Sequence, residues 1–113
     1  TDFVTIKYSS TIGIQPISTE IPDRFELKQN YPNPFNPSTR IQFSIPNAAT
    51  DSRSVKLEIY DISGKLIRTL LNEDLNAGMY EIDFDASGLA TGTYFYRLTT
   101  DNFTETKKML LIK

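Results

Sequence analysis

Short apolar runs that alternate with polar residues recur along this chain, and they constrain its fold more than any other feature. From Arg40 to Ile45 the apolar side chains occupy every second position, and Val55 to Tyr60 repeats the pattern. Period-two alternation is what a half-buried antiparallel strand requires, because successive side chains point to opposite faces. No segment shows a helical period of 3.6 residues over a window of about 11 residues, so we expect essentially no helix.

Seven strands are expected beyond Arg24. They are Phe25–Leu27, Arg40–Ile45, Val55–Tyr60, Lys65–Leu71, Met79–Phe84, Thr93–Thr99 and Phe103–Ile112. Strands of this length, separated by turns every 8–12 residues or roughly so, are typical of two packed sheets. The sequence therefore predicts an all-β fold, an immunoglobulin-like antiparallel β-sandwich of about seven strands.

Three turn signals support this fold class. Asp61-Ile62-Ser63-Gly64 combines an Asx-type opener with a glycine that accepts a positive φ, as a hairpin requires, and Asp85-Ala86-Ser87-Gly88 is a second turn of similar composition. Gly92-Thr93-Tyr94 stands at the start of the sixth strand. In immunoglobulin-like sandwiches a tyrosine at this point hydrogen-bonds back to the backbone and forms a tyrosine corner.

The chain divides into three parts by composition. Residues 1–8 hold a single β-prone run, which cannot be stable alone, and we expect them to be the tail of a preceding passenger domain. Residues 9–24 are rich in Ser and Thr, contain two prolines and have no sustained period, which predicts a linker. Residues 25–113 are the predicted sandwich, and 113 residues leave room for one such domain.

The composition excludes several classes of function. With no Cys and no His, the chain cannot build the usual zinc sites, a thiol nucleophile or a triad with an imidazole base. A net charge of −2, with no basic stretch before the C-terminus, argues against nucleic-acid binding. No apolar run is long enough to span a bilayer. We expect no cofactor, and if the protein is exported we expect its signal peptide upstream of Thr1.

One segment contains three closely spaced prolines, Tyr31-Pro32-Asn33-Pro34-Phe35-Asn36-Pro37. Proline lacks the N–H that a central strand must donate, so this segment belongs at a sheet edge or outside the ladder. Tyr31 and Phe35 are expected to anchor it across one end of the sandwich. It is either a rigid cover that blocks unwanted strand pairing or a recognition element.

Four blocks of residues, in order, resemble the C-terminal sorting domains of the bacterial type IX secretion system (Por secretion family, type A). The first block opens at Phe25 and runs through the proline segment to Thr39. The later blocks are Ile59–Lys65, Leu89–Leu98 and Lys107–Lys113. The hairpin block alone is shared with other sandwich domains, so the specificity comes from the order of all four.

The resemblance implies a non-catalytic sorting signal. Such domains fold in the periplasm, are recognised by an outer-membrane translocon, and are removed by a sortase-like protease that can attach the passenger to surface lipopolysaccharide. The passenger then reaches the cell surface or the medium. Cleavage is expected within residues 9–24. The implied recognition residues are Gly92, Tyr94, Lys107, Lys108 and Lys113.

The last predicted strand is apolar on both faces toward its end. Lys107, Met109 and Leu111 share one face, and Lys108, Leu110 and Ile112 share the other. At least one face is therefore core or a partner surface. If the strand lies at a sheet edge, a translocon component could pair with its backbone; the alternative is an ordinary last strand whose lysines deter aggregation.

Two acidic residues, Asp83 and Asp85, share a strand face with Glu81. They are candidates for calcium binding or for acid–base chemistry, although a solvated face followed by a turn explains the same pattern. Tyr94 and Tyr96 are expected in the core, with a sugar-binding platform as the alternative.

The leading interpretation is a secretion and sorting domain. The rival is a retained structural or carbohydrate-binding β-sandwich module of an extracellular protein, which should expose a row of aromatic side chains. A third hypothesis, with little support from the residues, is a small hydrolase that uses carboxylates.

Overall fold

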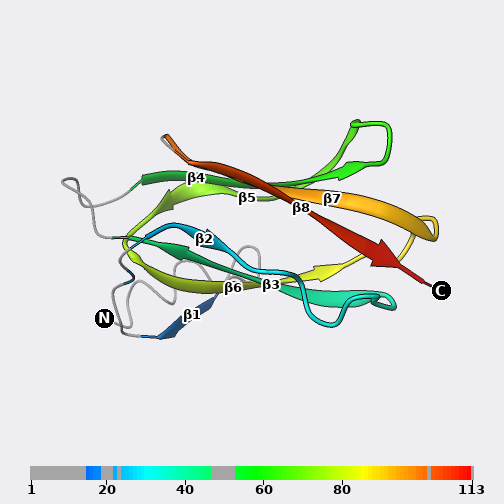
Figure 1. The fold of residues 1–113 in the computed structure, drawn as a ribbon, viewed down its shortest axis with the longest axis horizontal. Helices are drawn as coiled ribbons and strands as arrows, with labels where there is room; N and C mark the ends of the chain where they lie inside the picture. The colour runs from blue at the N-terminus through cyan, green and yellow to red at the C-terminus, as the bar shows by residue number, and fades with distance from the viewer. Residues whose placement is uncertain (1–14, 19–21, 23, 47–52, 102, 113) are drawn as a thin grey trace.

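Two antiparallel four-stranded sheets pack face to face (Figure 1). The structure is a computed structural model, and it describes residues 15–18, 22, 24–46, 53–101 and 103–112. No helix forms among these residues. The strands are β1 (Gln15–Ser18), β2 (Glu26–Leu27), β3 (Ser38–Ile45), β4 (Arg53–Asp61), β5 (Leu66–Leu75), β6 (Gly78–Asp85), β7 (Gly92–Thr99) and β8 (Thr104–Leu111).

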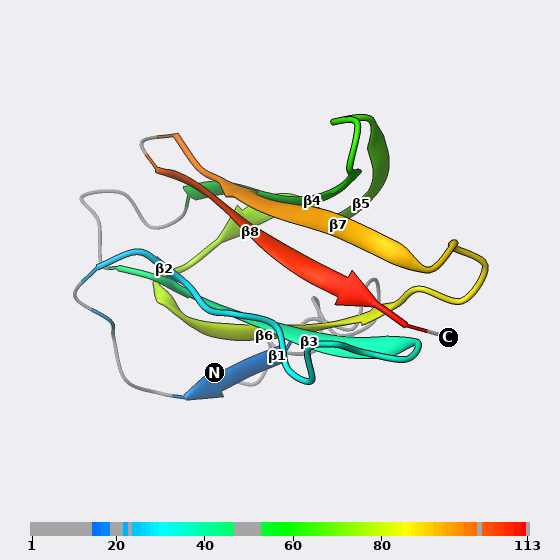
Figure 2. The same cartoon turned by 45° about the vertical axis from the view of Figure 1, so that its right-hand side comes forward.

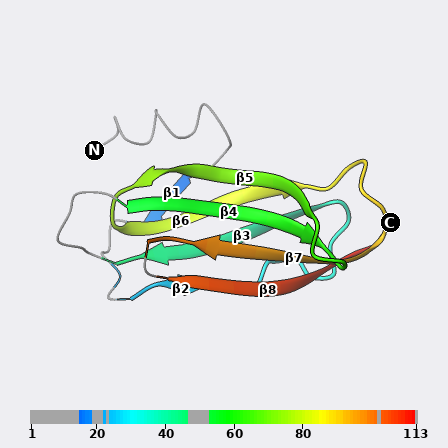
Figure 3. The ribbon, with the colours of Figure 1, turned by 90° about the horizontal axis from the view of Figure 1, so that it is seen from above.

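The order of the strands identifies the type of sandwich. One sheet has the order β1-β6-β3-β2 and the other β5-β4-β7-β8. Figure 3 shows the second sheet lying over the first. The chain crosses between the sheets after β3, after β5 and after β6, which is the connectivity of immunoglobulin-like sandwiches. The predicted all-β sandwich is confirmed.

Each of the seven predicted strands is present, and the predicted end that differs most from the structure is the C-terminal end of β5. This strand runs to Leu75 rather than ending at Leu71, because its pairing with β4 continues as far as Arg53 opposite Leu75. Two register shifts in the same pair break the alternation, so that Leu70 and Leu71 are both buried. Pairing partners, and not the local period, decide where a strand ends.

An eighth strand, β1, forms inside the segment expected to be a linker. It pairs antiparallel with β6, from Gln15 opposite Glu81 to Ser18 opposite Met79, with a register shift after Pro16. Strand pairing needs backbone groups and no particular side-chain period, so the Ser/Thr-rich composition gave no sign of it. The tail at residues 1–8 and most of the linker lie outside the described residues, and the domain division stays a prediction.

The core lies between the two sheets, where the alternating residues meet. On β3 the predicted inward positions Ile41, Phe43 and Ile45 are buried. On β4 the same holds for Val55, Leu57 and Ile59. The largest fully buried side chains come from five strands and the proline segment: Tyr96, Phe35, Phe43, Phe84, Ile41, Ile45, Leu57, Ile59, Leu71, Leu75 and Ile82.

Candidate functional site

The proline segment lies against the last strand, although the two are far apart in the sequence (Figure 2). The backbone N–H of Phe35 donates to the carbonyl of Leu110 (3.0 Å), and the N–H of Ile112 donates to the carbonyl of Phe35 (2.9 Å). These bonds place Phe35 parallel to Leu111 as an isolated bridge. The segment therefore extends the sheet by one short pairing beyond β8.

Two side chains close more of the same edge. The Asn33 carbonyl Oδ1 accepts the N–H of Leu110 (3.0 Å), and the Gln29 amide Nε2 donates to the carbonyl of Lys108 (2.8 Å). With the Phe35 bonds, the chain itself occupies four outward backbone groups of β8 and its end: the carbonyls of Lys108 and Leu110 and the N–H groups of Leu110 and Ile112. A translocon strand that paired here would first have to displace the proline segment.

A small buried polar network holds the proline segment in shape. Asn30 Nδ2 donates to Thr39 Oγ1 (3.0 Å) and to the carbonyl of Pro32 (3.2 Å), and Thr39 Oγ1 donates to that same carbonyl (2.8 Å). Both side chains are buried. Buried polar groups are costly unless they are bonded, so Asn30 and Thr39 fix the turn. The sequence carries no local signal for this network, because Asn30 and Thr39 lie on either side of the proline segment and meet only in the folded chain.

Phe35 is the apolar anchor of the segment and Tyr31 is not. Phe35 is 2% exposed, and its ring lies 6.1 Å from that of Phe84. Tyr31, in contrast, is 80% exposed. The expectation of two anchors is wrong, because the backbone of Tyr31 pairs with Arg40 of β3 and turns its side chain to the outer face of the sheet.

Tyr96 of β7 bonds to the backbone just before the proline segment, at Lys28 and Asn30. Its side chain is buried, its hydroxyl donates to the carbonyl of Lys28 (2.7 Å), and the same oxygen accepts the N–H of Asn30 (2.8 Å). Burial raises the pKa of Tyr96 to about 12. The expectation that Tyr94 and Tyr96 lie in the core is confirmed.

Replacing Tyr96 with phenylalanine is expected to lower the free energy of unfolding by about 1–3 kcal/mol at neutral pH, because one buried and one half-buried backbone group lose their partner. The pKa of this phenol is raised from 10.0 to about 12 by folding, so its contribution is complete below pH 10 and is lost as the pH rises toward 12. Urea unfolding of both proteins from pH 8 to pH 12 checks this. A difference between them that stays constant above pH 10 would contradict the assignment.

Tyr94 forms the predicted corner. It is buried, and its hydroxyl donates to the carbonyl of Ala90 (2.6 Å), four residues upstream. The bond ties the loop before β7 to the strand itself. Because the hydroxyl is bonded inside the domain, Tyr94 can contribute to recognition only through the shape of this loop.

Gly92 begins β7 with φ at +154°, a backbone conformation that side chains disfavour. An added Cβ would meet nothing within 4 Å, so the cost of a substitution comes from the backbone alone. Gly92→Ala is expected to destabilise the domain by about 1–3 kcal/mol, measured as a shift of the urea midpoint. Thr91→Ala, at the exposed neighbouring residue, is the control and should change stability by less than about 0.5 kcal/mol. Equal effects at both positions would rule out the backbone explanation.

The candidate lysines do not gather on one face. Lys107 lies on the core-facing side of β8 beside Met109 and forms an ion pair with Glu105 (3.3 Å). Lys108 points to the outer face, together with Leu110 and Ile112, which are 38% and 44% exposed. Lys113 lies outside the described residues. Of the two faces that the sequence left open, the first is core, and the second is exposed in the part of the chain that the structure describes.

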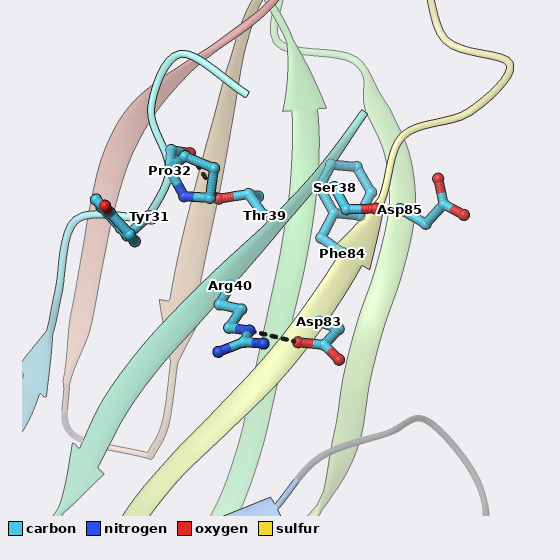
Figure 4. Close-up of a pocket in the computed structure, with 8 residues that line it drawn as sticks. All are labelled: Tyr31, Pro32, Ser38, Thr39, Arg40, Asp83, Phe84 and Asp85. Carbon is cyan, nitrogen blue, oxygen red and sulfur yellow. Dashed lines mark hydrogen bonds and ion pairs between the residues drawn. The ribbon is translucent and has the colours of Figure 1, made fainter. Parts of the chain in front are cut away.

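Asp83 and Asp85 line a groove of about 530 Å³ on the outer face of the first sheet (Figure 4). Asp83 is paired with Arg40 (3.6 Å). Asp85 accepts bonds from the N–H (2.9 Å) and the hydroxyl (2.6 Å) of Ser87, which lower its pKa. Within the described ranges, no three acidic residues gather in a way that could hold a metal ion.

The Asp85 turn and the turn of the β4–β5 hairpin have the same local hydrogen bonds. Asp61 accepts the N–H (2.9 Å) and the hydroxyl (2.6 Å) of Ser63, as Asp85 does with Ser87. A glycine follows with φ near +90° in both turns. The sequence Asp-x-Ser-Gly thus forms the same Asx turn twice. The Asx-type opener was predicted at Asp61 and a turn at Asp85, and the bonds to Ser87 account for the Asp85 carboxylate.

A comparison with known protein families gives a match to most of the chain. A family model described as a secretion system C-terminal sorting domain matches residues 29–113. The match includes the proline segment and β3 to β8, and leaves out β1 and β2. A search of curated proteins gave no match. In the part of the chain that the structure covers, no helix is long and apolar enough to cross a membrane.

Proposed function

The chain belongs to the family of secretion system C-terminal sorting domains, the sorting signals of type IX secretion, and we propose that its sandwich directs an upstream passenger across the bacterial outer membrane as a folded module. The observation that carries this proposal is the family match over 85 of the 113 residues, which follows from its limits at 29 and 113. The role needs no catalytic residue.

The surface that we propose for recognition is the outer face of β8 at its C-terminal end, defined by Lys108, Leu110 and Ile112. Two of these are among the exposed large apolar side chains of the described residues, and a cation lies beside them. Side chains are favoured over backbone pairing because the proline segment already occupies the strand edge at these residues. Lys107 and Tyr94 lie on the core-facing side of the same sheet, so we propose that they act through the folded shape of the domain.

The proposed route has three further steps. The domain folds in the periplasm, the outer-membrane translocon recognises it, and a sortase-like protease cuts within residues 9–24 before the passenger reaches the surface or the medium. β1 lies in that stretch and is paired with β6. Because proteases bind substrates as extended chains with free backbone groups, we expect cleavage outside Gln15–Ser18 unless β1 first detaches.

A secretion assay tests the proposal. The 113-residue chain is fused behind a fluorescent passenger with an export signal, in a host that has this secretion system. The test variant carries Lys108→Ser, Leu110→Ser and Ile112→Ser; the control carries Ile62→Ser and Leu66→Ser at exposed apolar side chains of the β4–β5 hairpin. We expect the parent and the control fusions outside the cell, shortened by the mass of the removed sorting domain. We expect the test variant to be retained in the periplasm.

The outcomes separate two claims. Periplasmic retention of the intact, folded parent fusion would overturn the sorting role. Export of all three fusions would keep the sorting role and overturn the proposed recognition surface. Export of the parent with the domain still attached would favour the alternative hypothesis. In that hypothesis the domain is a structural or carbohydrate-binding module that stays on the mature protein.

A further inference from the structure

Three side chains from three adjacent chain segments form a row on the outer face of the first sheet. Tyr31 and Arg40 exchange both backbone hydrogen bonds, each 3.0 Å long, so they are directly opposite and their side chains share a face. Arg40 is in turn opposite Asp83 in the β3–β6 pairing. Figure 4 shows this row, with the aromatic ring at one end and the carboxylate at the other.

The row lines the groove of about 530 Å³, together with Pro32, Ser38, Thr39, Phe84 and Asp85. Pockets of 300–1,000 Å³, or about that size, are usual for small ligands. The Tyr31 ring is almost fully exposed, and the Arg40 and Asp83 side chains are 67% and 65% exposed. The groove therefore offers an open aromatic face beside planar donors and acceptors.

The charges in the groove disfavour a strongly anionic ligand. Arg40 is the one cation among the lining residues, against Asp83 and Asp85. Its guanidinium already lies near Asp83 (3.6 Å) and near Glu81 (3.8 Å). A phosphate or nucleic acid would meet a surplus of carboxylates. The site suits a ligand that is neutral and polar.

The backbone of the groove disfavours an extended peptide. Peptides that lie on sheets gain much of their affinity from main-chain hydrogen bonds at a free strand edge. Here β3 runs between Tyr31 on one side and β6 on the other, and it is paired with both. At this point β3 thus offers its side chains to the groove and has no free strand edge.

We propose that this groove binds a neutral saccharide. The apolar C–H face of a pyranose ring would stack on Tyr31, as apolar ligand surface does on exposed aromatic rings. Adjacent hydroxyls would bridge the Arg40 guanidinium, which only donates, and the Asp83 carboxylate, which only accepts. Arg40 and Asp83 belong to β3 and β6, in the other sheet from β8, whereas Tyr31 and Pro32 belong to the proline segment, which also contacts β8 through Asn33 and Phe35.

Titrations of the whole 113-residue chain test this, followed by NMR chemical shifts. The probes are hexasaccharides of β-1,4-linked glucose, xylose, mannose and N-acetylglucosamine, and the same pyranose chemistry is tested as delipidated O-polysaccharide and as intact lipopolysaccharide. Tyr31→Ala and Asp83→Asn are expected to weaken binding about tenfold each, the first by the loss of an aromatic contact and the second by the loss of a charged hydrogen-bond acceptor. Ile62→Ala and Glu105→Gln are the matched controls at an exposed apolar residue and an ion-paired carboxylate elsewhere.

Binding that is weakened by the two groove variants and retained by both controls would support the site. Binding to the delipidated and the intact forms alike would assign recognition to the glycan, and binding to free hexasaccharides alone would assign it to unattached chains. The proposal is overturned if no probe shifts the resonances of the groove at millimolar concentration. It is also overturned if Tyr31→Ala binds like the parent.

Discussion

Replacing Phe35 with alanine is expected to lower the free energy of unfolding by about 3–5 kcal/mol, the cost typical of removing a buried phenylalanine. The side chain is 2% exposed, belongs to the main core cluster and packs near Phe84. The substitution also loosens the residue whose backbone bonds close the edge of β8. Since domains of this size have a total stability of about 5–15 kcal/mol, the variant should be close to unfolding.

The matched control for Phe35 is the other aromatic residue of the same segment. Tyr31→Ala removes a ring that is 80% exposed and should change stability by less than about 0.5 kcal/mol. Urea denaturation followed by circular dichroism measures both, with stability taken from the midpoint and slope. Similar losses for the two variants would show that the segment is held by its prolines and backbone and not by the Phe35 side chain.

Deleting residues 107–113 is expected to unfold the domain and not simply to remove a recognition signal. β8 contributes Met109 and Leu111, both fully buried, to the core. It also pairs with β7 along its whole length and provides the backbone partners of Phe35. Each buried side chain alone is worth about 2–5 kcal/mol when it is removed, and two of them approach the whole stability of the domain.

The truncation can be compared with substitutions that leave the core in place. Circular dichroism and limited proteolysis should show an unfolded, rapidly digested chain for the deletion. The variant with Lys108→Ser, Leu110→Ser and Ile112→Ser should keep the parent's spectrum, because these side chains lie on the outer face. A folded, protease-resistant deletion variant would contradict the assignment of β8 to the core. If the truncated protein is not secreted, that loss therefore does not identify which residues the translocon recognises.

The local patterns of the sequence determined seven of the strands and, where the alternation is regular, which face of the strand is buried. The alternation in β3 and β4 placed Ile41, Phe43, Leu57 and Ile59 in the core, since a strand's two faces follow from its own residues. The Asp-x-Ser-Gly turns and the Tyr94 corner were also predictable, because their bonds join residues two to four positions apart. The resemblance to sorting domains rested on such local blocks, and the family match agrees with it.

Only the tertiary structure decided what the proline segment does. Sequence spacing could not distinguish Tyr31 from Phe35, because their burial depends on contacts with Arg40 and with Leu110. Gln29 and Asn33 reach β8 across 79 and 77 positions, and no local period carries that information. The same holds for β1 and for the groove beside Tyr31, which exist because separate strands meet in one register. Side-chain periodicity reports the environment of one strand, whereas an edge, a cover or a groove is a property of strands brought together.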